Sequence, residues 1–122
     1  MTKRTVVFYR SASGACPVED FLNSQPGKVA KKIVWVLRLI EDMKFVPAQY
    51  FAKLPGTEEI WECRINLASN AYRVLCFLSG KSFVVLTHGF IKKTKKTPRN
   101  EINRAEACKR DYLERKDRHE RP

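Results

Sequence analysis

The sequence predicts an α+β domain in which two N-terminal helices and one C-terminal helix pack on a mostly antiparallel β-sheet. Apolar residues recur every three or four positions between residues 28 and 44, which is the period of an amphipathic helix. Apolar and polar residues then alternate over residues 60–67, which is the period of a strand. The 122 residues contain no repeat and no Gly/Ser linker, so residues 1–122 are expected to form a single domain.

The N-terminal part is expected to contain one strand and two helices. Residues 5–10 are β-branched or aromatic, which favours an opening strand. A short helix should follow from Pro17 to about Asn23, because proline suits the first turn and two acidic residues suit its positive end. The clearest helix spans residues 28–44 and ends before Pro47. Its expected core face consists of Val29, Ile33, Val36, Leu37 and Ile40.

The C-terminal part is expected to contain a meander of strands and a last helix. The expected extended segments are residues 50–54, 60–67, 72–78 and 82–88. The last of these hardly alternates, so we expect a central strand that is buried on both faces. Thr97 and Pro98 suggest the N-cap and first residue of a helix that runs to about Lys116. A basic tail is expected from about residue 117.

Charge is concentrated near the C-terminus. The net charge is +11, and residues 81–122 hold thirteen basic and six acidic residues, a net charge of +7. Such a surplus favours anionic partners. No apolar run approaches the ~20 residues that a membrane span needs, and the N-terminus lacks the pattern of a signal peptide. We therefore expect a cytoplasmic protein that does not contact membranes.

The cysteines indicate neither a disulfide framework nor a metal site. Cys16, Cys63, Cys76 and Cys108 are separated by 47, 13 and 32 positions, and neither histidine lies at ligand spacing from them. Structural zinc sites usually contain closely paired ligands. We expect the cysteines to be small core hydrophobes, and the protein to need no metal and no other cofactor.

Two arginines on neighbouring expected strands are candidates for binding phosphate. A guanidinium offers paired donors that match phosphate oxygens. Arg64 lies on the polar face of its strand, where a surface salt bridge with Glu62 is the alternative. Arg73 lies in an apolar strand, where its charge needs an acceptor. Either Glu62 or an external phosphate can be that acceptor.

A basic segment follows the last expected strand. Five of the eight residues in Lys92–Arg99 are basic, which indicates either an anion-binding segment or a solvated loop. We expect it to lie at the sheet end, beside the strands that carry the two arginines. His88 suits acid–base chemistry, or else a hydrogen-bonded structural role. Tyr72 and Phe90 can stack on bases, or can belong to the core.

Three segments in order resemble the RelE/ParE superfamily of bacterial toxins, specifically its HigB-like, phage-associated branch. They are Ile60–Arg64, Tyr72–Leu75 and His88–Pro98, with an amphipathic helix before them and another helix after them. The resemblance covers about residues 4–116. It implies a RelE-like fold, a mostly antiparallel sheet with helices packed on one side. It also implies the toxin of a type II toxin–antitoxin system, neutralised by a cognate antitoxin.

The resemblance also implies an activity. RelE-like members bind the ribosome and cut mRNA there, which inhibits translation; the expected reaction needs no metal and begins with attack by the RNA 2′-hydroxyl. The resemblance suggests Arg64 and Arg73 as phosphate contacts and Lys92 and Lys93 as the basic residues after the last strand. Unlike the best-known RelE pattern, this sequence has no tyrosine soon after Lys93. The expected catalytic residues are Arg64, Arg73, Lys92, Lys93 and His88, and the expected RNA-binding residues are Lys95, Lys96 and Arg99.

Two other functions fit part of the sequence. A ParE-like toxin would block a DNA gyrase without cutting RNA, although the dense cationic segment beside two strand arginines argues for the nuclease. A plain nucleic-acid-binding module would need only the basic C-terminal third. The order of the three segments is what distinguishes the nuclease from such a module.

Overall fold

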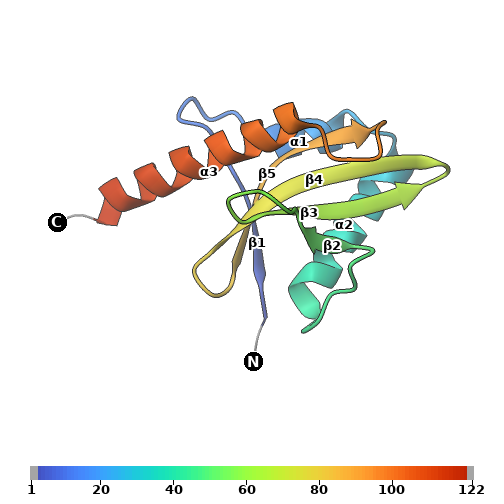
Figure 1. Cartoon of the computed structure of the whole chain (residues 1–122), viewed down its shortest axis with the longest axis horizontal. Coiled ribbons are helices and arrows are strands. Elements are labelled where there is room, and N and C mark those ends of the chain that lie inside the picture. The colour runs from blue at the N-terminus through green and yellow to red at the C-terminus, as the bar shows by residue number, and fades with distance from the viewer. Residues whose placement is uncertain (1–2, 121–122) are drawn as a thin grey trace.

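A computed structural model describes residues 3–120, and the side chains of residues 3–118. In chain order the elements are β1 (Thr5–Phe8), α1 (Pro17–Asn23), α2 (Gly27–Asp42), β2 (Phe51–Lys53), β3 (Ile60–Leu67), β4 (Asn70–Ser79), β5 (Phe83–Lys92) and α3 (Arg99–Glu120). The five strands form one sheet in the order β1-β5-β4-β3-β2, which α1 and α2 cover on one face and α3 crosses on the other (Figure 1). Strand β1 is parallel to β5, and the other neighbours are antiparallel. The α+β class is therefore confirmed.

The larger core lies between the sheet and α1 with α2. The expected α2 face is buried as predicted, and it packs on Cys63 and Ile65 of β3 and on Val74 and Cys76 of β4. The alternation over β3 is confirmed because Trp61, Cys63, Ile65 and Leu67 all belong to this core. All four cysteines are free thiols, three of them buried.

A second, smaller core lies on the opposite face, under α3. Ile102 and Ala105 of α3 pack with Leu75 and Phe77 of β4 and with Leu54, which follows β2. The expectation that all helices lie on one side is therefore wrong. Helix α3 carries apolar residues on one stripe only, and covers the face that α1 and α2 leave open. Within residues 3–120, no helix combines the length and apolar character that crossing a membrane requires.

Two strands are longer than expected, which brings the basic segment onto the sheet. Strand β4 begins at Asn70 because the β3–β4 turn has only two residues, Ala68 and Ser69, with φ angles of 49° and 71°. Strand β5 continues past His88 to Lys92, after an irregularity opposite Leu75 and Cys76. Lys92 is thus a strand residue paired with Ala71 and not part of the following loop.

The start and end of α3 also differ from the expectation. The carbonyl of Pro98 accepts hydrogen bonds from the N–H groups of Glu101 and Ile102, so Pro98 and not Thr97 precedes the first turn. The Thr97 hydroxyl is bonded elsewhere, to a strand carboxylate. The helix continues to Glu120, four residues beyond the expected end, while residues 121 and 122 of the expected tail lie outside the described residues.

Candidate functional site

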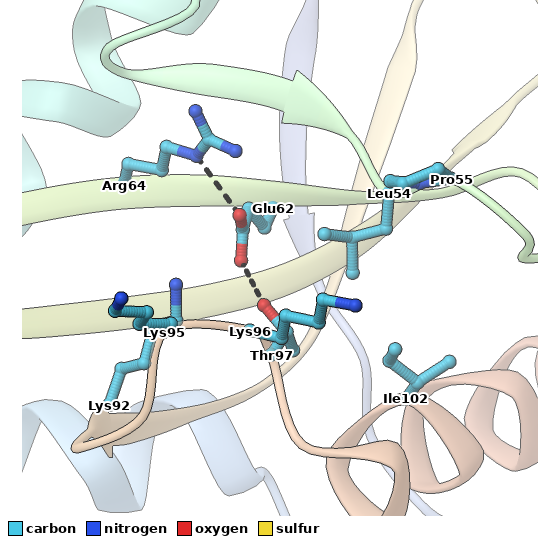
Figure 2. A pocket seen from close by; sticks show the side chains of 9 residues that line it. All are labelled: Leu54, Pro55, Glu62, Arg64, Lys92, Lys95, Lys96, Thr97 and Ile102. Atoms are coloured by element: carbon cyan, nitrogen blue, oxygen red, sulfur yellow. Dashed lines mark hydrogen bonds and ion pairs between the residues drawn. The ribbon is translucent and has the colours of Figure 1, made fainter.

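A pocket of about 340 Å³ lies where β3, β5 and the loop before α3 meet (Figure 2). It forms because the loop of residues 93–98 leaves β5 and passes over the polar face of β3 before α3 begins. The lining residues are Leu54, Pro55, Glu62, Arg64, Lys92, Lys95, Lys96, Thr97 and Ile102. The wall is therefore cationic along one part and apolar along another, with one carboxylate between.

Glu62 organises the polar part of the site. Its side chain is buried, yet it contacts charged and polar groups from three segments. Oε2 accepts a hydrogen bond from Arg64 Nε at 3.0 Å, and Oε1 accepts one from the Thr97 hydroxyl at 2.7 Å. Arg73 Nε lies 3.6 Å from Oε1. Because a buried carboxylate is costly without such partners, Glu62 holds the two arginines and the loop in one arrangement.

Arg64 is the arginine that reaches the pocket. It lies on β3, next to the short edge strand β2, and its side chain is about one third exposed. Its Nη1 atom donates to the carbonyl of Ala48 at 3.0 Å. These bonds fix the guanidinium through Nε and Nη1, and within residues 3–120 they leave Nη2 without a hydrogen-bond partner. A fixed cation with an open donor is suited to an anionic oxygen.

Arg73 lies opposite Arg64 in the sheet but is buried. Its Nη1 donates to the carbonyl of Tyr72 at 2.9 Å, and its side chain is only 10% exposed. Burial lowers the pKa of Arg73, whereas the Glu62 carboxylate acts to raise it. The structure therefore places Arg73 behind Glu62, outside the pocket lining, where it acts through its charge.

Three lysines of the basic segment line the pocket. Lys92 is half-buried at the end of β5, and Lys95 and Lys96 are exposed on the loop. Burial, and next the positive charge of Arg73, lower the pKa of Lys92 below its usual value, while Glu62 opposes this. A lysine with a lowered pKa gives up its proton more readily, so it can serve as a base as well as a cation.

Two expected site residues lie away from the pocket. Lys93 is exposed but does not line the cavity. Arg99 opens α3, and its guanidinium lies 3.9 Å from the carboxylate of Glu106, about two helical turns later. Both residues are close in the chain to residues that line the pocket. They add positive charge near the pocket but do not form part of its wall.

His88 is separated from the pocket by burial. The ring is 1% exposed, with Nδ1 at 3.0 Å from the Thr87 hydroxyl and Nε2 at 3.0 Å from Glu101 Oε1. In a neutral ring with its proton on Nε2, Nε2 donates to Glu101 and Nδ1 accepts from the Thr87 hydroxyl, which then gives up its hydrogen bond to the Leu75 carbonyl at 3.1 Å. The structure thus assigns His88 the hydrogen-bonded structural role, joining β5 to α3, and does not support the catalytic one.

We expect His88 to make stability depend on pH. Burial, and next the charge of Arg104, lower its pKa below 6.5, although Glu101 acts in the opposite direction. Below pH 6.5 the unfolded chain therefore takes up a proton that the folded chain refuses, and the free energy of unfolding falls as pH falls. The slope should approach about 1.4 kcal/mol per pH unit. Urea unfolding between pH 5.5 and 7.5 should show this decline in the wild type and a flatter profile in His88→Gln; equal slopes would contradict it.

The two candidate stacking residues belong to the cores. Tyr72 is buried against α1 and α2, and Phe90 packs against the second core, stacked on His88 with ring centroids 5.9 Å apart. The core interpretation is confirmed for both. Among the described residues, no group of three or more His, Cys, Asp or Glu side chains is placed to hold a metal.

Several pocket residues were not expected from the sequence. The sequence predicts Glu62 only as an ion-pair partner and Thr97 only as a helix cap. Leu54, Pro55 and Ile102 lack any local signal of function, because they line the cavity only when α3 crosses the sheet. The one usable signal was the polar position of Glu62 between apolar neighbours in a strand.

No curated protein matches the sequence. Residues 20–110, which run from within α1 through α2 and β2–β5 to the first half of α3, match the family described as phage-derived protein Gp49-like (DUF891). This match includes the arginines, the carboxylate and the lysines of the pocket, so the chain belongs to the phage-derived Gp49-like family, a RelE/toxin-like family.

Proposed function

We propose that this protein is the HigB-like toxin of a type II toxin–antitoxin system, a ribosome-dependent endoribonuclease that cuts mRNA and so inhibits translation. The observation that carries the proposal is the pocket, where Arg64, Lys92, Lys95 and Lys96 surround a single buried carboxylate in a member of a RelE/toxin-like family. These groups can bind a phosphodiester and stabilise the charge that grows on it during cleavage.

In the proposed reaction the RNA 2′-hydroxyl attacks the adjacent phosphorus. The new bond closes a 2′,3′-cyclic phosphate, and the bond to the 5′-oxygen breaks. Arg64 Nη2 and the ammonium groups of Lys95 and Lys96 stabilise the negative charge on the phosphoryl oxygens. Arg73 acts as a positioning residue, because it helps to hold Glu62 and therefore Arg64. No metal or cofactor is required.

Lys92 is the proposed general base. It lies in the pocket wall, and burial and next the charge of Arg73 lower its pKa, which increases the fraction of neutral amine that can accept the 2′-hydroxyl proton. An ammonium group at the rim, on Lys95 or Lys96, then supplies a proton to the leaving 5′-oxygen. The products are a 2′,3′-cyclic phosphate and a free 5′-hydroxyl.

The proposal is tested by mapping new mRNA 5′ ends after brief expression in bacterial cells. New ends inside translated frames, which disappear when translation initiation is blocked, are the expected result. Growth inhibition with DNA damage and no new ends would replace the proposal with a gyrase inhibitor. A folded protein that gives neither toxicity nor new ends, but binds nucleic acid, would leave a binding module.

Lys92→Arg separates the charge of Lys92 from its basicity. Arginine keeps the positive charge but stays protonated, so it cannot accept the 2′-hydroxyl proton. We expect cleavage to fall by about 10²–10⁴-fold while binding of uncleavable RNA changes by only a few fold. Single-turnover cleavage and binding are measured on the same preparation. Wild-type cleavage in Lys92→Arg would exclude Lys92 as the base.

Lys95 and Lys96 should bind RNA phosphates in addition to supplying the proton for the leaving 5′-oxygen. Each neutralised phosphate of single-stranded RNA contributes about 0.7 to the slope of log affinity against log salt. The double variant Lys95→Ala/Lys96→Ala should therefore lower the magnitude of that slope by about 1.4, if each lysine contacts one phosphate. Filter binding between 50 and 300 mM salt measures the slope. A matched variant, Lys28→Ala/Lys31→Ala at two exposed positions of α2, should leave it unchanged.

The proposed partners are the ribosome with its mRNA and a cognate antitoxin. The cationic rim would attract the anionic RNA of the first and an acidic segment of the second. Competition between an antitoxin and single-stranded RNA for the purified toxin would show whether both use this rim.

A further inference from the structure

The apolar end of the pocket has no part in the proposed chemistry. It is formed by Leu54, Pro55 and Ile102, which Figure 2 shows on one side of Glu62, with Lys92 and Lys95 on the other. Lys96 extends toward the apolar end. Leu54 and Ile102 are 6% and 8% exposed, so this end of the pocket is a small opening onto the second core. An apolar surface beside a cationic one is suited to a ligand that has an apolar part next to an anionic part.

The walls of this end are held in place by the fold. The N–H of Leu54 donates to the carbonyl of Ile60 at 2.9 Å, and the Leu54 carbonyl accepts from the Thr57 hydroxyl at 2.7 Å. Ile102 lies in the first turns of α3 and packs into the second core. The Thr97–Glu62 hydrogen bond anchors the loop that enters α3. These contacts fix the walls of the apolar end before a ligand binds, which lowers the entropy cost of binding.

We infer that this apolar subsite binds the base of a nucleotide whose 3′-phosphate lies among Arg64, Lys92 and Lys95. This inference rests on the proposed function and names the part of the substrate that the pocket selects. A nucleotide joins a flat, largely apolar base to a phosphate through one ribose, which matches an apolar wall next to a cationic one. The volume of about 340 Å³ lies at the lower end of the ~300–1,000 Å³ typical of small-molecule sites.

The chemistry of the walls also sets the selectivity of the subsite. Leucine, proline and isoleucine side chains offer contact area but neither donors nor acceptors. The two oxygens of Glu62 are already bonded to Arg64 and Thr97. The base is therefore held mainly by the area it buries, and a purine should bind more tightly than a pyrimidine by a few fold.

The test compares four probes by NMR titration of the wild-type chain at constant ionic strength. They are adenosine 3′-monophosphate, cytidine 3′-monophosphate, ribose 5-phosphate and inorganic phosphate. We expect the adenosine nucleotide to bind about tenfold more tightly than ribose phosphate, with the cytidine nucleotide between them. Intermolecular NOEs should join adenine protons to the methyl groups of Leu54 and Ile102. Equal affinities for all four probes, or NOEs to methyl groups elsewhere, would overturn the inference.

Variants then locate the gain in affinity. Pro55→Ser changes an exposed turn residue and should reduce the preference for nucleotide over ribose phosphate. Leu54→Ala should reduce this preference further, but it also leaves a cavity in the second core. Val34→Ala, at an exposed position of α2, should leave the preference unchanged. Unchanged preference in a folded Pro55→Ser and Leu54→Ala pair would overturn the subsite.

These results separate the subsite from the proposed nuclease. Phosphate binding with no further gain from a base would reject the subsite and leave the nuclease standing. A clear nucleotide preference in a protein that produces no mRNA ends would retain the subsite and reject the nuclease. Failure of every probe to bind would reject the subsite, and the mapping of mRNA 5′ ends would then decide the ribosome-dependent nuclease by itself.

Discussion

Replacing Arg64 with alanine should reduce mRNA cleavage by about 10²–10³-fold while the protein stays folded. Arg64 is the strand arginine that lines the pocket, and loss of one preorganised donor to a developing charge typically has an effect of this order. The side chain is one third exposed, so its removal should affect folding much less than cleavage. Cleavage is measured by 5′-end mapping in cells and in reconstituted translation, with near-UV circular dichroism as the measure of folding.

Two further arginine variants make this result specific. Arg64→Lys keeps the charge but loses the bonds through Nε and Nη1, so we expect an intermediate rate. Arg38→Ala removes an exposed arginine from α2, on the other face of the sheet, and should cut mRNA at the wild-type rate. Undiminished cleavage by a folded Arg64→Ala protein would remove Arg64 from the proposed mechanism.

Arg73 is less suited to this test, although the sequence predicts both arginines as phosphate contacts. An arginine in an apolar strand signals a special environment, and the structure shows that environment to be the buried side of Glu62. Its loss would change both folding and activity. The sequence does not rank the two arginines, because their exposure depends on the order of the strands, in which β4 lies in the centre of the sheet and β3 lies next to the short edge strand β2.

Local periodicity explains which parts of the fold were predictable. Strand β3 and the core face of α2 follow from the two- and 3.6-residue patterns, which burial on one face imposes on the sequence. Strands β4 and β5 are longer than predicted, because the pairing of Ala71 with Lys92 is a long-range contact that leaves no local pattern in the sequence. The position of α3 on the second face was missed for the same reason.

The site was predictable only where charge marked it. The clustered lysines and the paired strand arginines stand out in the sequence, and the fold brings Arg64, Lys92, Lys95 and Lys96 to one cavity. The prediction that Thr97 caps α3 is wrong. A threonine before proline is typical of a helix start, but the Thr97 hydroxyl donates a hydrogen bond to Glu62. The apolar wall could not be found, because Leu54 and Ile102 are core residues until the tertiary structure exposes one edge of each.

Glu62→Ala should be the most destabilising single change in the site. Removal of this carboxylate leaves the buried Arg73 without its counter-ion and close to Arg64 and Lys92. Breaking a buried ion pair by removing one partner costs about 3 kcal/mol or more, which corresponds to a fall in Tm of roughly 10 °C for a domain of this size. Thermal unfolding followed by circular dichroism measures the change.

The loss of stability in Glu62→Ala should arise because this carboxylate is buried among cations, and not because a carboxylate is removed. Glu59→Ala breaks an ion pair with Lys53 that is largely exposed, and should cost less than about 1 kcal/mol. In the double variant Glu62→Leu/Arg73→Met the unpaired buried charge is gone, so it should be more stable than Glu62→Ala. High salt should partly restore Glu62→Ala by screening its remaining cations. A Glu62→Ala protein as stable as Glu59→Ala would mean that the cations do not depend on this carboxylate, and that Arg64 is positioned by its bond to the Ala48 carbonyl alone.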